Sequence, residues 1–118
     1  MDQDVPRIVR ETISLAEVLE LADRSFGDMV KASVDIGRGV LAIGGELHSD
    51  EEALLIEDGS AQADVWGINI YPGEPGGAWI EFDSMINVRP GQGNRSRSVD
   101  DPAIQSKIRQ IVEALIRR

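Results

Sequence analysis

Residues 30–43, VKASVDIGRGVLAI, are the segment that decides the fold. In its first half every second residue is apolar, which is the period of a strand with one buried face. The Gly-Arg-Gly that follows predicts a tight turn, because glycine readily adopts the positive φ that such turns require. With the turn centred on Gly-Arg, Val34 lies opposite Leu41 and Ala32 lies opposite Ile43. The segment therefore predicts an antiparallel hairpin with one apolar face.

A second hairpin is predicted further along the chain. Residues 66–71 and 80–89 both alternate apolar and polar side chains, and the Pro/Gly-rich residues 72–77 connect them. If this loop closes symmetrically, Asn69 lies opposite Glu81. The same polar face of the second strand would also carry Asp83, Asn87 and Arg89.

Three helices are predicted around these hairpins. Ser14 begins one over residues 14–24 and Ser49 begins one over residues 49–57, each with a glutamate three residues later as in a capping box. Asp101, followed by proline, begins the last helix, whose apolar stripe is Ile104, Ile108, Ile111, Val112 and Leu115. With a short strand in residues 5–13, the order is (β)αββαββα. We expect an α+β fold in which about three helices pack on one face of an antiparallel sheet of two hairpins, with four or five strands.

The composition is that of one globular domain spanning residues 1–118. Hydrophobic residues make up 42% and charged residues 28%, and there is no cysteine for a disulfide or a thiolate metal site. The charged first ten residues lack the apolar core of a signal peptide, and no apolar run approaches the ~20 residues that span a bilayer. We expect a cytoplasmic protein with no membrane association. No motif indicates a metal site or a cofactor: the Walker and dinucleotide-binding glycine patterns are absent.

The charge is distributed unevenly along the chain. The net charge of −9 opposes binding to nucleic acid, which we therefore expect to be absent. No Lys or Arg stands between Arg38 and Arg89, whereas residues 84–99 contain three arginines and no acidic residue. This inversion makes residues 89–97 the first place to look for a function.

The loop at residues 89–97, RPGQGNRSR, has the composition of an anion-binding loop. Glycines let backbone N–H groups approach a ligand, and arginine offers a planar fork for phosphate or carboxylate. We predict recognition of an anionic small molecule or an acidic protein surface, through Arg89, Asn94, Arg95 and Arg97, with Asn87 on the strand that leads into the loop. The alternative is a surface loop whose arginines pair with the chain's own acids, including Asp100 and Asp101.

Two other functions remain open. Glu46 and the only histidine, His48, stand beside a flexible Gly-Gly, and Asp83 lies near the arginines. A small hydrolase or transferase could use Glu46, His48 and Asp83 for acid–base chemistry, with arginine as an electrophilic clamp. A self-associating module is the third possibility, in which the basic loop of one copy docks on the acidic residues 46–64 of another.

Several segments resemble those of one protein family: FGDMVKA at residues 26–32, AIGGELH at 42–48, residues 54–59, WGINIYP at 66–72, and residues 80–90 with NRSR at 94–97. This family of short prokaryotic proteins is known only as a domain of unknown function. The resemblance covers nearly the whole chain and implies one compact domain. It implies no activity and identifies no catalytic residue.

Overall fold

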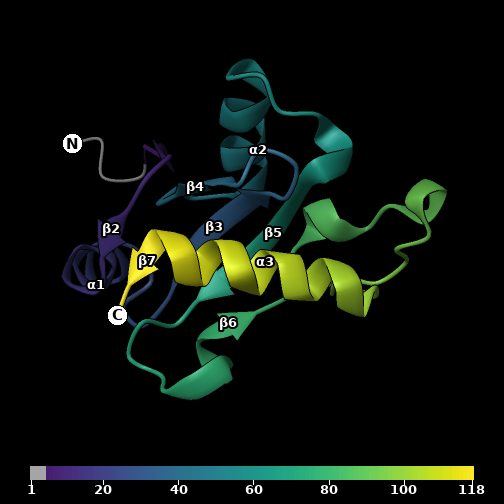
Figure 1. Cartoon of the computed structure of the whole chain (residues 1–118). Coiled ribbons are helices and arrows are strands. Elements are labelled where there is room, and N and C mark those ends of the chain that lie inside the picture. The colour runs from purple at the N-terminus through teal and green to yellow at the C-terminus, as the bar shows by residue number, and fades with distance from the viewer. Residues whose placement is uncertain (1–4) are drawn as a thin grey trace.

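The structure is a computed structural model that describes residues 5–118; the first four residues of the charged start lie outside the described residues. Its centre is a five-stranded sheet with the order β1-β4-β3-β5-β6, in which all neighbours are antiparallel (Figure 1). The strands are β1 (Arg7–Val9), β3 (Val30–Asp35), β4 (Val40–Ile43), β5 (Val65–Ile70) and β6 (Ile80–Glu81). The predicted α+β class and its antiparallel sheet are confirmed.

Both predicted strand registers are confirmed. Val34 lies opposite Leu41 and Ala32 opposite Ile43 in the hairpin of β3 and β4. In the second pair, Asn69 lies opposite Glu81. The two hairpins join edge to edge because β3 also pairs with β5 over its whole length.

Three α-helices flank the sheet: α1 (Leu15–Arg24), α2 (His48–Glu57) and α3 (Pro102–Leu115). Ser14 caps α1 by accepting from the backbone of Glu17, and Asp101 caps α3 by accepting from the backbone of Ala103, as the sequence predicts. The predicted cap of α2 by Ser49 is wrong. That helix begins at His48, and its N-cap residue, Leu47, offers no side-chain hydrogen bond.

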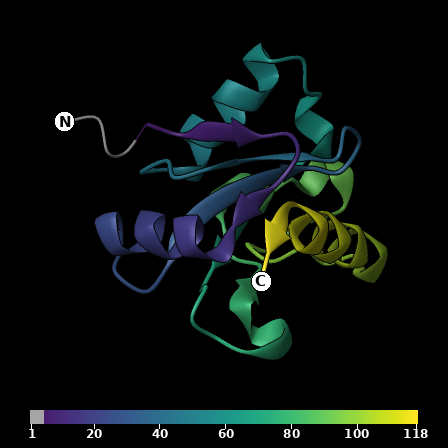
Figure 2. The ribbon, with the colours of Figure 1, turned by 60° about the vertical axis from the view of Figure 1, so that its left-hand side comes forward.

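The helices cover both faces of the sheet, so the prediction that they share one face is wrong for α2. Figure 2 shows α1 and α3 on one side of the strands and α2 on the other. The larger core lies under α1 and α3. A smaller apolar cluster on the opposite face joins α2 to the sheet and contains Val40, Ala42, Leu55 and Val65. The physical reason is that β4, VLAI, is apolar on both faces and both must be covered.

The predicted strand at 80–89 is much shorter in the structure. β6 ends at Glu81, and Ser84 then caps a 3₁₀ turn, η3 (Met85–Asn87). Asn87 explains the change: its Oδ1 accepts from the Gly67 N–H at 2.8 Å and its Nδ2 donates to the Gly67 carbonyl at 2.9 Å. The side-chain amide of Asn87 thus makes the two hydrogen bonds with Gly67 that the backbone of a neighbouring strand would otherwise make.

A second, unpredicted sheet joins residues 13–14 to the C-terminal end of the described chain. After α3 the chain continues as β7 (Ile116–Arg117), which pairs in parallel with β2 (Ile13–Ser14). The segment 5–13, predicted as one strand, therefore divides between β1 and β2 and joins two sheets. Within residues 5–118, no helix is long and apolar enough to cross a bilayer.

Candidate functional site

A cavity of about 460 Å³ lies on the face of the sheet that carries α2. Its floor comes from β3, β5 and β6, and its walls come from the start of α2 and from the segment after β6, with Arg97 at one side. Three residues that the sequence singled out line it together: His48, Asp83 and Arg97. Glu46, the third predicted catalytic residue, is exposed and does not line the cavity.

The floor carries a row of three polar residues in register. Lys31 on β3 lies opposite Asn69 on β5, which lies opposite Glu81 on β6. Since neighbouring strands are about 4.8 Å apart, the backbones of Lys31 and Glu81 are about 10 Å apart. Lys31 makes no salt bridge within the described residues, and its Nζ lies 5.2 Å from the ring centroid of Phe26. The floor therefore presents a positive charge on one side and a carboxylate on the other.

Asn69, at the centre of this row, has an acceptor without a donor. Its Nδ2 donates to Glu81 Oε1 at 2.9 Å and to the Asp83 carbonyl at 3.2 Å. Since an ionised carboxylate and a carbonyl only accept, the orientation of the amide is fixed. Asn69 is only 5% exposed, and its Oδ1 has no hydrogen-bond partner in the part of the chain that the structure describes. Leaving such an acceptor unpaired costs about 1–3 kcal/mol.

Arg97 uses only part of its guanidinium within the protein. Its Nε donates to Asp83 Oδ1 at 2.7 Å, and its two Nη atoms make no hydrogen bond to any described residue. Both side chains are well exposed, so the pair itself stabilises the fold little. The free Nη edge is the fork that binds carboxylate or phosphate with two parallel hydrogen bonds. Arg97 can therefore bind an anion while it remains paired with Asp83.

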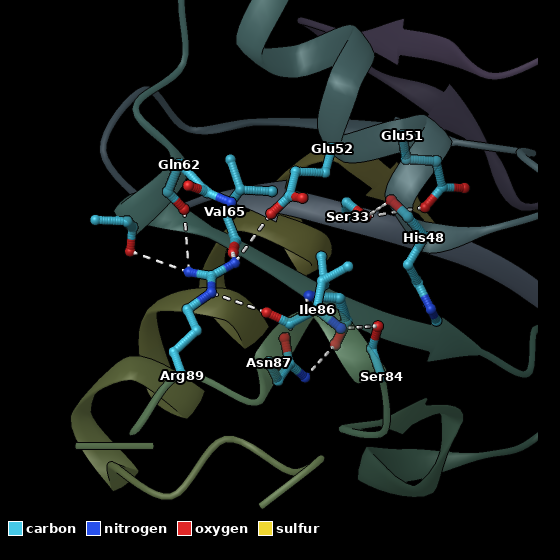
Figure 3. A network of polar contacts seen from close by, with 12 residues as sticks. Ser33, His48, Glu51, Glu52, Gln62, Val65, Ser84, Ile86, Asn87 and Arg89 are labelled. Atoms are coloured by element: carbon cyan, nitrogen blue, oxygen red, sulfur yellow. Dashed lines mark hydrogen bonds and ion pairs between the residues drawn. The ribbon is translucent and has the colours of Figure 1, made fainter. Parts of the chain in front are cut away.

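His48 is the first residue of α2, and Figure 3 shows its side chain on that helix. The ring is held in one neutral form. Its Nε2 lies 2.7 Å from the Ile68 carbonyl, which only accepts, so Nε2 carries the proton. Burial, aided by the positive charges of Lys31 and Arg97, lowers the pKa of His48 to about 4, although the hydrogen bond to Ile68 acts in the opposite direction. At neutral pH its Nδ1 is an acceptor, with no partner among residues 5–118.

The start of α2 adds a weak positive potential to the cavity. Ser49 lines the cavity, and its backbone N–H donates to no described residue because Leu47 supplies no cap. Uncapped N–H groups and the helix dipole favour an anion at this end. Glu51 follows in the same turn, where it accepts from Ser33 Oγ at 3.0 Å and from the Gly45 N–H at 2.9 Å. Burial raises the pKa of Glu51 to about 8, so it adds little negative charge at neutral pH.

Arg89, a predicted ligand-binding residue, is instead occupied within the protein (Figure 3). Its side chain is 11% exposed and pairs with Glu52 at 3.2 Å. All three of its nitrogens donate to the protein, the partners other than Glu52 being backbone carbonyls of Gln62, Ala63, Val65 and Ile86. No donor of Arg89 is left for a ligand, so it fastens the start of the arginine loop to α2 and β5.

Asn87 and Asn94, which the sequence also placed in the binding site, are buried and structural. Asn87 pairs with Gly67 as described above and also donates to the Arg97 carbonyl. Asn94 donates to the backbone carbonyls of Asn87, Ser96 and Ser98 and accepts from the Asp100 N–H at 2.7 Å. Together they fix the path of the loop that presents Arg97.

Arg95 is exposed, and its side chain makes no hydrogen bond or ion pair within the described chain. It does not line the cavity. Asp100 accepts from the backbone of Arg95 and from the Ser96 hydroxyl, and Asp101 caps α3, so neither acid binds an arginine side chain. The two arginines of this loop that do pair with acids, Arg89 and Arg97, use Glu52 and Asp83.

The sequence did not identify Lys31, Ser49 or Tyr71 as parts of this site. Lys31 could have been placed on the polar face by the alternation of its strand, but its position beside Asn69 depends on the pairing of β3 with β5. Within residues 5–118, no three His, Asp or Glu side chains are grouped as metal ligands.

Comparison with known proteins identifies the family. The model of the family described as "Protein of unknown function (DUF5674)" matches residues 7–115, nearly the whole chain. The chain belongs to this family, which confirms the resemblance seen in the sequence. No curated protein and no solved structure matches the chain.

Proposed function

We propose that this member of the DUF5674 family binds a small anionic molecule in the cavity between α2 and β6, and that Arg97 holds the anionic group. The observation that carries the proposal is the free Nη edge of Arg97 at the side of a cavity of about 460 Å³. Arginine recognises phosphate and carboxylate through this edge. Asp83 orients it from the opposite side through Nε.

The charges around the cavity support an anionic ligand. The chain as a whole carries −9, but Lys31 and Arg97 balance Glu81 and Asp83 at this site. His48 is neutral above a pKa of about 4, and the uncapped start of α2 contributes positive potential. Positive and negative side chains around the cavity are therefore equal in number, and the cationic groups of Lys31 and Arg97 can donate to a ligand.

The loop at residues 89–97 contributes to the proposed site, but its residues have different roles. Arg97 contacts the ligand, whereas Arg89, Asn87 and Asn94 fix the loop through their buried hydrogen bonds. Arg95 points a second free guanidinium to solvent outside the cavity, where it adds only long-range attraction.

The test compares two arginines of the same loop. Isothermal titration of the wild type, Arg97→Ala and Arg95→Ala would be carried out with inorganic phosphate, pyrophosphate and citrate at low salt. We expect at least one anion to bind the wild type, with a Kd at least tenfold higher for Arg97→Ala, since a hydrogen bond to a charged group contributes about 1.5–3 kcal/mol. Arg95→Ala should bind within about threefold of the wild type, because rim charges contribute little affinity. Absence of binding by all three anions, or equal losses in both variants, would overturn the proposal.

A hydrolase or transferase is the second candidate, and the unpartnered Nδ1 of His48 is the observation that favours it. His48 and Asp83 line the same cavity as Arg97, so a base, a carboxylate and an electrophilic clamp are available together. Glu46 is not part of this set. Turnover of phosphate or carboxylate esters that His48→Gln abolishes, while leaving anion binding unchanged, would identify a reaction in addition to binding.

A further inference from the structure

We infer that the ligand is a phosphorylated sugar or polyol, whose phosphate binds Arg97 and whose hydroxyl groups donate to acceptors on the cavity floor and wall. This inference rests on the proposed function and deepens it. Its basis is a set of acceptors, on residues that line the cavity, that have no donor within the described chain and that a single inorganic phosphate would satisfy only in part.

Asn69 is the first of these acceptors. Asn69 is only 5% exposed, and its Oδ1 lacks a donor within residues 5–118. Turning the amide over would not help, because Nδ2 already serves Glu81 Oε1 and the Asp83 carbonyl. No described residue therefore supplies a donor for Oδ1.

His48 and Glu81 supply two more acceptors. The Nε2 proton of His48 is committed to the Ile68 carbonyl, so its Nδ1 can only accept while the ring is neutral. Glu81 Oε1 accepts from Asn69 Nδ2 and from the Tyr71 hydroxyl at 3.3 Å, while Oε2 has no partner among the described residues. All three residues line the cavity.

The donors around the cavity suit a phosphate. They are the Nη edge of Arg97, the ammonium group of Lys31 and the backbone N–H of Ser49 at the start of α2. Phosphate oxygens accept from such donors, and a helix N-terminus favours their charge.

Hydroxyl groups explain the remaining acceptors better than an ammonium group does. Lys31 and Glu81 lie on either side of Asn69 on the two neighbouring strands, so their opposite charges offset each other at that position and favour a neutral donor. A hydroxyl group donates to Asn69 or His48 without bringing a charge of its own. The cavity of about 460 Å³ also exceeds the needs of a single phosphate and falls in the range of small-molecule sites.

The experiment measures the contribution of hydroxyl groups to affinity. Isothermal titration of the wild-type chain would compare glycerol 3-phosphate with n-propyl phosphate, which has the same carbon chain without hydroxyls. Ribose 5-phosphate, glucose 6-phosphate and inorganic phosphate would complete the panel. We expect at least one hydroxylated phosphate to bind at least tenfold more tightly than both propyl phosphate and inorganic phosphate.

Two variants locate the effect. Asn69→Leu should remove most of the hydroxyl advantage while leaving the Kd for propyl phosphate within about twofold, and His48→Phe should act in the same direction. Arg97→Ala should weaken every phosphate in the panel. If a variant fails to fold, the comparison of hydroxylated phosphates with propyl phosphate on the wild type still tests the inference.

Other outcomes separate the two proposals. Equal affinity for hydroxylated and non-hydroxylated phosphates overturns the ligand class and leaves the anion site intact. Binding of citrate without binding of any phosphate does the same. No binding of any anion overturns the proposed function and this inference together.

Discussion

Arg97 donates to Asp83 through Nε at 2.7 Å and leaves both of its Nη atoms without a partner in the described chain. This relationship distinguishes Arg97 from Arg89, whose three nitrogens all donate to the protein. Two arginines of one loop thus have opposite roles. Arg89 fastens the loop, and Arg97 is the one that can serve a ligand.

Arg89→Met should destabilise the fold strongly. It removes the hydrogen bonds to four backbone carbonyls and leaves Glu52, which is 14% exposed, without its cation. Breaking a fully buried pair costs about 3–5 kcal/mol, so for this partly buried pair with its additional hydrogen bonds we expect a loss of about 3 kcal/mol. Urea unfolding measures the loss, and Arg95→Met is the matched control, expected to change the free energy of unfolding by less than about 0.5 kcal/mol. Similar small losses for both variants would contradict the structural role of Arg89.

Asp83→Ala should leave the free energy of unfolding within about 1 kcal/mol of the wild type. The ion pair with Arg97 is well exposed, and such pairs contribute about 0–1 kcal/mol. Thermal and urea unfolding check this expectation. A loss above about 2 kcal/mol would mean that the pair stabilises the fold and does not mainly orient Arg97.

Asn87→Ala should cost about 2–4 kcal/mol. The substitution leaves the N–H and the carbonyl of Gly67 without partners on a buried strand, and each unpaired group costs about 1–3 kcal/mol. Urea unfolding gives the value. Asn87→Asp keeps the acceptor for the Gly67 N–H, but an ionised carboxylate would be buried against the carbonyls of Gly67 and Arg97. The loss should therefore be smaller at low pH, where the protonated acid can donate to Gly67, than at neutral pH. The same loss at both pH values would argue against the pairing with Gly67.

The free energy of unfolding should fall as the pH rises from about 6.5 to about 8. Burial raises the pKa of Glu51 from 4.5 to about 8, so between these values the unfolded chain has lost a proton that the folded chain keeps. The contribution of Glu51 to the free energy of unfolding is fully present below pH 4.5 and is lost as the pH rises toward 8. His48 has the opposite slope, because its pKa falls from 6.5 to about 4, so the two effects oppose each other below 6.5.

Glu51→Gln isolates this effect. The amide keeps the shape of the side chain without ionising, so the slope between pH 6.5 and 8 should disappear. At its steepest the wild-type slope is about 1.4 kcal/mol per pH unit. Urea unfolding at half-unit steps of pH measures it. A wild-type profile that is flat or rises across this interval, or a slope that persists in Glu51→Gln, would show that Glu51 is not the group responsible.

Local patterns predicted much of the fold. The alternation around the Gly-Arg-Gly turn placed Val34 opposite Leu41, and the symmetric closure of the second loop placed Asn69 opposite Glu81. The cap of α3 by Asp101 also follows from nearby residues alone. These features depend on contacts within one hairpin or one helical turn, which the sequence order already contains.

Contacts between distant segments were not predictable in the same way. Residues 80–89 were predicted as one strand, but the strand ends at Glu81 and the side chain of Asn87 pairs with Gly67, a residue 20 positions earlier in the chain. Arg89 looked free because its partner, Glu52, lies 37 residues earlier in the chain. Lys31 lies beside Asn69 because β3 pairs with β5, and this pairing of distant segments could not be read from local sequence patterns.

A ¹H–¹⁵N NMR titration of the wild-type chain with inorganic phosphate tests the central claim most directly, because it shows both whether an anion binds and where. The account predicts saturable shifts of the Arg97 Nε–Hε signal and of the Ser49 backbone amide, with little change at Arg95. Shifts that centre on Arg95, or the absence of any saturable shift at Arg97, would contradict it.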